Sequence, residues 1–135
     1  AGGITNCSNW QQELATLLSD LPDQVVLFNP RQKSFQMEDP EAGKRQIEWE
    51  VRHFRYSKAI SFWFAEETLQ PIALFELGRY LEYRHIGFFV GAHPRYARRF
   101  DVVEQLYHHR RGLEVQSSLE GLADQIRTWC KERRV

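Results

Sequence analysis

The sequence predicts an α/β domain in which a doubly wound parallel sheet carries helices on both faces, in three layers. Short apolar segments that suit buried strands alternate with amphipathic helical patterns along the whole chain, which is the order of βαβ units. With 135 residues the chain is long enough to bury one hydrophobic core. It contains no repeat, low-complexity tract or linker, so we expect residues 1–135 to form a single domain.

The first helix is predicted to follow a glycine turn at residues 1–6. Ser8 and Gln11 have the spacing of a capping box, and apolar residues recur on one stripe of the helix that follows. The segment Gln24–Phe28 has the composition of a buried strand and ends at a polar turn. We therefore expect a helix and then a strand in this part of the chain.

Two further helix patterns enclose a strand in the middle of the chain. The second helix is expected from about Lys44 to Tyr56, and the strand over Ala59–Phe64. Pro71 suits the first turn of a third helix, expected to run to about Tyr83, because its missing N–H has no partner to lose there. The predicted inner face of the second helix consists of Ile47, Val51 and Phe54.

The last third of the chain repeats the alternation. A third strand is expected over Ile86–Gly91 and a helix from about Arg99 to His109. A short strand near Leu113–Val115 leads to the last helix, for which Ser117 and Glu120 have cap spacing.

One strand of this pattern is missing from the sequence. A glycine turn that feeds a helix normally follows a strand, and no strand segment stands before Ala1. We therefore expect about five strands in the natural protein, with an apolar first strand before Ala1 at the centre of the sheet.

The composition excludes several function classes. Lys plus Arg equals Asp plus Glu, at 18 each, so the chain lacks the broad basic footprint of a protein that binds duplex nucleic acid. No apolar run is long enough to span a bilayer, and no secretory hydrophobic region is present. Cys7 and Cys130 make neither a disulfide framework nor a zinc spacing. We expect a cytoplasmic protein with no membrane partner, no metal and no cofactor.

A single carboxylate, Glu76, stands in the otherwise apolar run Ile72–Leu77 of the third predicted helix. Such a group costs free energy unless it is paired, hydrogen-bonded or used for function. A second acid, Glu67, lies in the loop that precedes this helix. Because open α/β sheets bind ligands beyond the carboxyl ends of their strands, the two acids predict a site at this edge. The alternative is a structural Glu76 that pairs with Arg79 or with backbone N–H groups.

The order of several short motifs resembles the nucleoside 2-deoxyribosyltransferase-like family over nearly the whole chain. The motifs are residues 1–6, Asn29–Arg31, Gln46–Glu50, Phe62–Phe64, Glu67-Thr68, Phe75–Gly78 and Val90–Tyr96. The segment Ala65–Arg79 is also similar to the 2′-deoxynucleoside 5′-phosphate N-hydrolases. The resemblance implies a flavodoxin-like domain and a homodimer or higher homo-oligomer whose subunits complete each other's pockets.

The resemblance also implies roles for particular residues. Glu76 is the expected carboxylate nucleophile, and Glu67 is the acid that holds the sugar or helps to protonate the base. The glycine turn approaches the ligand closely, through Gly2, Gly3 and Ile4. Ser57-Lys58 stand where this superfamily often has an aspartate, which leaves transfer and hydrolysis both open.

Six further positions are candidate ligand contacts, and four of them have a structural alternative. Asn29 and Arg31 follow a predicted strand end, where they line a pocket or grip a phosphate, or where Asn29 stabilises a turn. Trp49 stacks on a base or packs. Thr68 binds a sugar hydroxyl or caps a helix. The last two candidates are Tyr96, after the third strand, and Asp101, which accepts hydrogen bonds from the base or pairs with a neighbouring arginine.

The sequence thus predicts an enzyme that cleaves or transfers at the N-glycosidic bond of 2′-deoxynucleosides or their 5′-monophosphates. Its partner is a small nucleoside or nucleotide, and no metal is involved. Two other hypotheses stay open: a non-catalytic nucleotide-binding module, and an oligomeric scaffold on the same fold.

Overall fold

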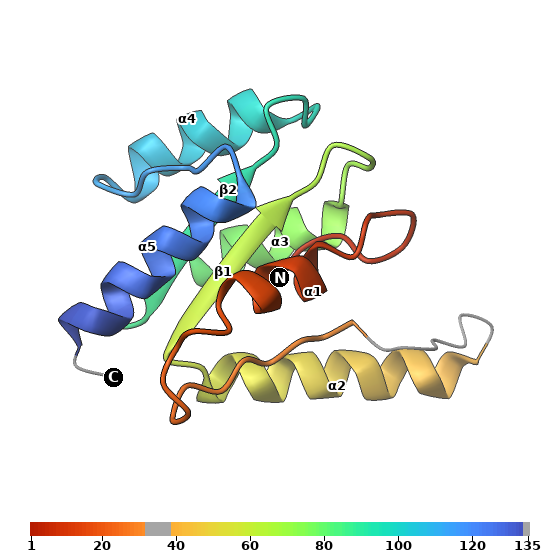
Figure 1. The fold of residues 1–135 in the computed structure, drawn as a ribbon. Helices are drawn as coiled ribbons and strands as arrows, with labels where there is room; N and C mark the ends of the chain where they lie inside the picture. The colour runs from red at the N-terminus through yellow and green to blue at the C-terminus, as the bar shows by residue number, and fades with distance from the viewer. Residues whose placement is uncertain (32–38, 134–135) are drawn as a thin grey trace.

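The computed structural model describes residues 1–31 and 39–133, and it contains five helices and two strands in that part of the chain (Figure 1). The order of the elements is α1 (Trp10–Leu17), α2 (Pro40–Tyr56), β1 (Ala59–Phe64), α3 (Pro71–Tyr80), β2 (Gly87–Ala92), α4 (Arg99–His109) and α5 (Leu119–Glu132).

The two strands form a parallel sheet that single bridges widen on both sides. β1 pairs with β2 in a register that runs from Ala59 opposite Gly87 to Phe64 opposite Ala92. Gly2 makes a parallel bridge to Trp63, and Gln116 makes one to Gly91. Four chain segments therefore lie side by side and run in the same direction. The structure confirms an α/β fold with a parallel sheet, and it does not establish five strands or flavodoxin-like layering.

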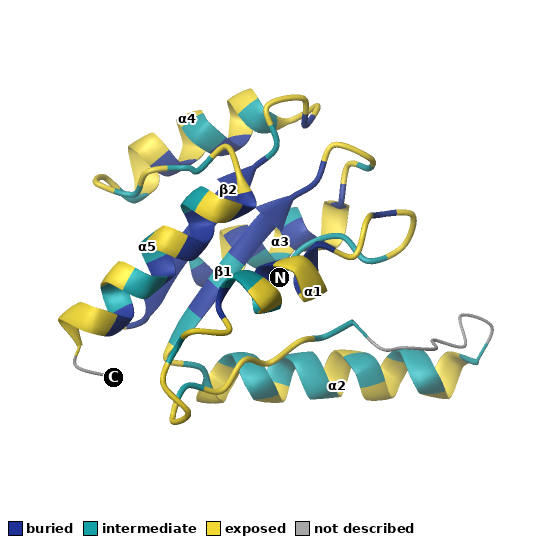
Figure 2. Ribbon diagram, in the orientation of Figure 1, coloured by how far each residue is buried: buried dark blue, intermediate teal, exposed yellow. Residues whose placement is uncertain are grey.

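Helices cover both faces of this sheet, which explains why its strands are apolar throughout. Side chains alternate along β1: Phe62 and Phe64 enter the core beneath α3 and α4, whereas Trp63 enters the core beneath α1 and α5. All six residues of β2 are buried, and Figure 2 shows both strands mainly in dark blue. The α3 residues that reach the first core are Ala73, Leu77 and Tyr80.

The predicted strand Gln24–Phe28 is wrong for the structure, since these residues lie outside any strand. Val26 is 69% exposed and Phe28 is 45% exposed. A strand needs a partner for its N–H and C=O groups, and among the described residues none pairs with this segment. The predicted strand at Leu113–Val115 likewise reduces to the single bridge of Gln116.

Several predicted helix ends are also wrong by one to four residues. The cap of α1 is Asn9, whose side chain accepts a hydrogen bond from the Gln12 N–H, and not Ser8. Ser118, not Ser117, caps α5 through the Gly121 N–H. The second helix begins at Pro40, four residues before the predicted start, because Asp39 caps it there. The third helix ends at Tyr80 and not at Tyr83.

The predicted inner face of α2 is wrong as well. Ile47 is 62% exposed, and Phe54 alone of the three predicted residues packs on the main core, with its ring centroid 4.5 Å from that of Tyr80. The helix turns Trp49 and His53 inward instead, toward the cavity described below.

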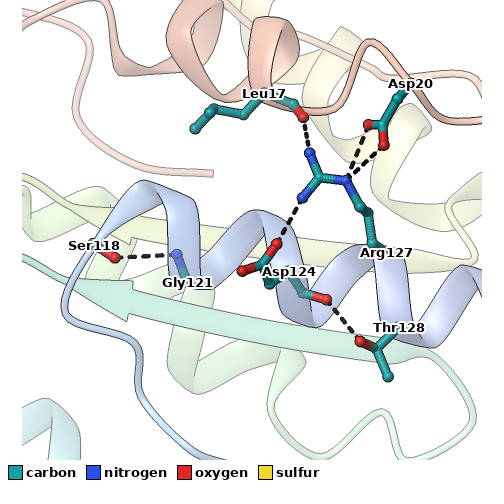
Figure 3. Close-up of polar contacts among 7 residues, drawn as sticks. All are labelled: Leu17, Asp20, Ser118, Gly121, Asp124, Arg127 and Thr128. Atoms are coloured by element: carbon teal, nitrogen blue, oxygen red, sulfur yellow. Dashed lines mark hydrogen bonds and ion pairs between the residues drawn. The ribbon is translucent and has the colours of Figure 1, made fainter.

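Arg127, on α5, connects that helix to the end of α1, on the sheet face that α3 and α4 do not cover (Figure 3). Its guanidinium binds both carboxylate oxygens of Asp20, at 3.0 and 2.9 Å, and it also donates to Asp124 and to the Leu17 carbonyl. This cluster holds α1, which supplies one wall of the cavity. In the described part of the chain, no helix has the length and apolar character that crossing a bilayer requires.

Candidate active site

The loop between β1 and α3 is tied to the glycine turn by one buried side chain, Gln70. Its Nε2 donates to the carbonyls of Ala65 and Thr68, and its Oε1 accepts from the Gly3 N–H at 2.9 Å. The backbone of Gln70 is left-handed, with φ of 54°, and Pro71 follows at the first position of α3. This arrangement sets where α3 begins relative to the glycine turn.

Glu76 faces a cavity of about 750 Å³, while Ala73 and Leu77 of the same helix face the core. Within the described residues, no ion pair joins Glu76 to Arg79 or to any other cation of a side chain. The guanidinium of Arg79 lies over the Tyr80 ring instead, 5.7 Å from its centroid. The structural alternative of a Glu76–Arg79 pair therefore has no support.

The environment of Glu76 makes its carboxyl unusually basic. Burial raises its pKa from 4.5 to about 7, and the nearby Glu50 carboxylate adds to the rise. A carboxyl group with this pKa exchanges its proton near neutral pH. Such perturbed groups in a cavity mark candidate catalytic residues.

Glu50 is a second carboxylate on the wall of the same cavity, and our sequence analysis did not select it. It comes from α2, where Gln46 donates a 2.8 Å hydrogen bond to Glu50 Oε1 and a 2.9 Å bond to the Pro30 carbonyl. The spacing of four residues between Gln46 and Glu50 places both on one side of the helix. The four-residue spacing of Gln46 and Glu50, next to the candidate Trp49, is the sequence pattern that could have identified Glu50.

An aromatic group lines the cavity beside the two carboxylates. The Trp49 and His53 rings stack with centroids 3.8 Å apart, and Phe28 meets His53 edge-on at 4.5 Å. Trp49 is therefore at the cavity, where a planar ligand could reach it, and not in either hydrophobic core.

The glycine turn forms another part of the wall through Gly2 and Ile4. A Cβ on Gly2 would lie 2.4 Å from the Trp63 carbonyl oxygen and 2.6 Å from the Trp10 ring, so only glycine fits this close approach. Gly3 is not on the cavity wall. Its carbonyl accepts hydrogen bonds from the Trp10 and Gln11 side chains.

Of the two candidates after the first predicted strand, Asn29 lines the cavity and Arg31 does not. Asn29 also accepts a 2.9 Å hydrogen bond from the Arg31 N–H, which is the turn-stabilising alternative. The Arg31 guanidinium donates to the carbonyls of Ser8 and Cys7 and to the Gln11 side chain. Through these contacts Arg31 connects the loop after Phe28 to the start of α1 and the residues before it.

The acidic turn before α3 lies outside the cavity wall. Glu67 is exposed, and hydrogen bonds from its own backbone N–H and from Ser8 lower its pKa. Glu66 forms an ion pair with Arg95. Thr68 contacts the Cys7 sulfur at 3.1 Å. The structure thus brings Glu76 together with Glu50, and it does not bring Glu76 together with Glu67.

The two candidates furthest along the chain are also away from the cavity wall. The Tyr96 hydroxyl donates a 2.6 Å hydrogen bond to the Leu69 carbonyl, and the ring is buried. Asp101 is exposed and pairs with Arg98 at 3.2 Å. In the part of the chain that the structure describes, no group of three or more His, Cys, Asp and Glu side chains could hold a metal ion.

A comparison with protein families places the chain in a known family. The profile described as nucleoside 2-deoxyribosyltransferase like matches residues 1–96. The chain belongs to the nucleoside 2-deoxyribosyltransferase-like family. The matched region contains both Glu50 and Glu76, and it ends before α4. A comparison with curated proteins finds no match.

Proposed function

We propose that this protein cleaves the N-glycosidic bond of 2′-deoxynucleosides or their 5′-monophosphates, with Glu76 as the nucleophile. The observation that carries the proposal is the cavity-facing Glu76 carboxyl, whose pKa burial raises to about 7 and which has no cationic side-chain partner among the described residues. Membership of the nucleoside 2-deoxyribosyltransferase-like family supports the choice of substrate class.

The proposed reaction has two displacement steps at the C1′ carbon of the sugar. In the first step, a Glu76 oxygen bonds to C1′ while the C1′–N bond breaks, and the base leaves with the electron pair and takes up a proton. In the second step, the acceptor attacks C1′, the bond from C1′ to Glu76 breaks to release the carboxylate, and the acceptor gives its proton to the acid that protonated the base. A water acceptor gives hydrolysis, and a second base gives transfer.

A desolvated carboxylate suits this chemistry because positive charge develops on the sugar ring in the transition state. The burial and like-charge repulsion that raise the pKa of Glu76 both disfavour its ionised form in the empty site. A cationic ring beside the carboxylate relieves that penalty, so the interaction is stronger in the transition state than in the ground state. The 2-deoxyribose lacks a 2′-hydroxyl that would withdraw electrons, which eases the cleavage.

We assign the second acidic role to Glu50 in preference to Glu67. Glu50 lies on the cavity wall with Glu76 and is oriented by Gln46, whereas Glu67 accepts the Ser8 N–H at the start of the α1 segment. In this assignment Glu50 helps to deliver the proton to the departing base. The stacked Trp49 and His53 rings are positioned to contact the base.

The test is incubation of the protein with a panel of 2′-deoxynucleosides and 5′-monophosphates, with and without an added free base. Base exchange indicates transfer, and release of free base alone indicates hydrolysis. Glu76→Gln should abolish either activity, and mass spectrometry of denatured wild type should show one attached deoxyribosyl group. Glu50→Gln should lose more activity than Glu67→Gln.

The outcomes separate the enzyme from its alternatives. A Glu76→Gln variant that keeps most of its activity would refute the assignment of the nucleophile. Stabilisation of the fold by nucleotides without any product would favour the non-catalytic binding module. Glu104→Gln, which changes an exposed carboxylate on α4, is the matched control and should keep wild-type activity.

A further inference from the structure

Exposed basic side chains collect at the end of the molecule where the parallel strands begin. In a βαβ fold each helix runs back from the end of one strand to the start of the next, so the helices finish at this end. Figure 1 shows the C-terminal ends of α2, α4 and α5 on the same side as the start of β1. The exposed cations at or just after these element ends are Arg55, Lys58, Arg84, Arg111 and Arg133. We call these residues the basic end.

One half of the basic end joins the loop after α3 to the end of α4. The Arg84 guanidinium donates to the His109 carbonyl. The Arg110 guanidinium donates to the carbonyls of Leu81 and Ile86, at 2.7 and 3.2 Å. Burial lowers the pKa of Arg110, and the charge of Arg84 lowers it further, so the cations of this region stand close enough to repel one another.

The other half of the basic end joins the start of the sheet to the end of α5. The Gly87 N–H donates to the Lys58 carbonyl at 2.9 Å, and a Cβ on Gly87 would lie 2.8 Å from the Trp129 ring. Arg133 lies over that ring, 4.9 Å from its centroid. Because Gly87 directly follows the loop that α4 holds, the two halves belong to one continuous surface.

The cations of the basic end have few acidic partners. Arg84 pairs with Glu82, two residues before it, at 3.3 Å. The other four members form no ion pair in the described part of the chain. At the opposite end of the strands, by contrast, Arg95 is paired with Glu66. The chain is neutral as a whole, but this surface carries charge that a polyanion would neutralise.

Exposed aromatic rings stand beside these cations. Tyr56 follows Arg55 and is 73% exposed, and Tyr107 on α4 is 60% exposed. The rings of Tyr83 and His85 lie nearly parallel on either side of the loop cation, with centroids 5.9 Å apart. The helix dipole favours a cation at a helix end, but it gives no reason for exposed rings. Rings that alternate with cations are typical of surfaces that bind single-stranded nucleic acids, where bases stack and phosphates meet the cations.

We propose that the basic end binds a single-stranded nucleic acid, with its cations on the phosphates and Tyr56, Tyr83 and Tyr107 stacked on bases. A duplex keeps the faces of its bases inside its own stack, so it offers these rings nothing to stack on. Binding to an anionic membrane uses Trp, Phe and Leu side chains that enter the lipid boundary, whereas these three rings all carry a hydroxyl.

The inference concerns a binding surface and does not depend on the proposed reaction. Lys58 and Arg133 also line the cavity, so a small phosphate is the competing ligand that the experiment must distinguish from a strand.

Fluorescence anisotropy with labelled oligothymidylate and oligouridylate, over a series of salt concentrations, tests the proposal. We expect wild type to bind both strands, and to bind a duplex of the same length roughly 10-fold more weakly because stacking is lost. Arg55→Gln/Arg111→Gln should reduce the slope of log affinity against log salt by roughly 1.4, since each phosphate contact of a single strand contributes about 0.7. Tyr107→Ala should weaken binding roughly 10-fold without changing that slope, because it removes a ring and not a charge.

The matched control is Lys44→Gln/Arg45→Gln, which removes the same charge from the other end of α2, where both side chains are exposed. This variant should keep the wild-type affinity and slope. Circular dichroism checks that each variant is folded. If the double variant of the basic end does not fold, Lys58→Gln replaces it, with an expected loss of about 0.7 in slope.

The proposal is overturned if wild type binds neither strand at low salt, if the slope is unchanged in a folded variant of the basic end, or if the control loses as much affinity. Equal affinity for the duplex, displacement of the strand by an equimolar 5′-monophosphate, or tighter binding to vesicles of anionic lipid would overturn it as well. Because the readout is binding and not turnover, a failure here is distinguishable from a failure of the proposed reaction.

Discussion

Replacement of Glu76 by glutamine should stabilise the protein, and the gain should grow as the pH rises. Glutamine keeps the size and the hydrogen-bonding shape of the side chain but cannot ionise. The wild-type carboxyl has a pKa of about 7 in the folded protein, mainly because of burial, against an ordinary value of 4.5. Between these two pH values the folded chain binds more protons than the unfolded chain, so the wild-type free energy of unfolding falls as the pH rises.

The size of this effect follows from the shift. A rise of about 2.5 pKa units corresponds to about 3.4 kcal/mol, at about 1.36 kcal/mol per unit. The side chain is partly exposed, so we discount the figure to about 2 kcal/mol. Glu76→Gln should therefore match wild type near pH 4.5 and exceed its free energy of unfolding by about 2 kcal/mol at pH 8.

Urea denaturation of both proteins at pH 4.5 and pH 8 measures the difference directly. Groups that titrate alike in the two proteins cancel in the comparison. Glu104→Gln should show no comparable dependence on pH, since Glu104 is exposed on α4. If the difference between Glu76→Gln and wild type is the same at both pH values, the carboxyl is not desolvated, and the argument for its reactivity fails with it.

Three further predictions follow from the site and its support. Glu50→Gln should move the inflection of the kcat/KM profile to lower pH, because Glu50 contributes to the raised pKa of Glu76. Trp49→Ala should raise KM roughly 10-fold with a smaller change in kcat, if the base stacks on the indole. Arg127→Ala should lower the urea midpoint of unfolding, because the variant loses the bonds to Asp20, Asp124 and Leu17.

Each of these predictions has a control on the same element. Glu48→Gln, on the outer side of α2, should leave the inflection where it is in wild type. Ile47→Ala removes an exposed apolar side chain of α2 outside the cavity wall and should leave KM unchanged. Lys131→Ala should lower stability less than Arg127→Ala. If the inflection of the kcat/KM profile is unchanged in Glu50→Gln, Glu50 does not act on Glu76. If KM is unchanged in Trp49→Ala, the base does not stack on Trp49.

The central part of the fold could be predicted from the sequence because its strand and helix segments differ clearly in composition from the residues beside them. Ala59–Phe64 is a continuous apolar run, and the structure forms β1 over those residues. Pro71 at the start of α3 and the bounds of α4 were predicted for the same reason, since their signals lie within a few neighbouring residues. The segment Gln24–Phe28 failed because a strand depends on pairing with another segment, which its own composition does not reveal.

The same distinction explains which candidate site residues were found. Glu76 stands out because the residues around it in α3, from Ile72 to Leu77, are otherwise apolar, so the carboxylate is conspicuous without any knowledge of the fold. Glu50 lies in a helix with many charged residues, where its sequence neighbours give it no contrast. Its role becomes visible only when α2 places it on the same cavity wall as Glu76. Glu67 was selected for its nearness in sequence to Glu76, but a loop side chain can bond elsewhere, and this one accepts the Ser8 N–H.

The burial of Glu76 near a second carboxylate is unfavourable, and other interactions in the fold must offset this cost. Two carboxylates face one cavity, and burial disfavours the charge on Glu76. The surrounding elements keep this arrangement by fixing each helix independently: Gln70 holds the start of α3, and Gln46 holds Glu50 against the Pro30 loop. These bonds fix the backbone positions from which the two carboxylates project. A site built in this way retains an unfavourable charge in the absence of ligand, which a developing cationic sugar would relieve.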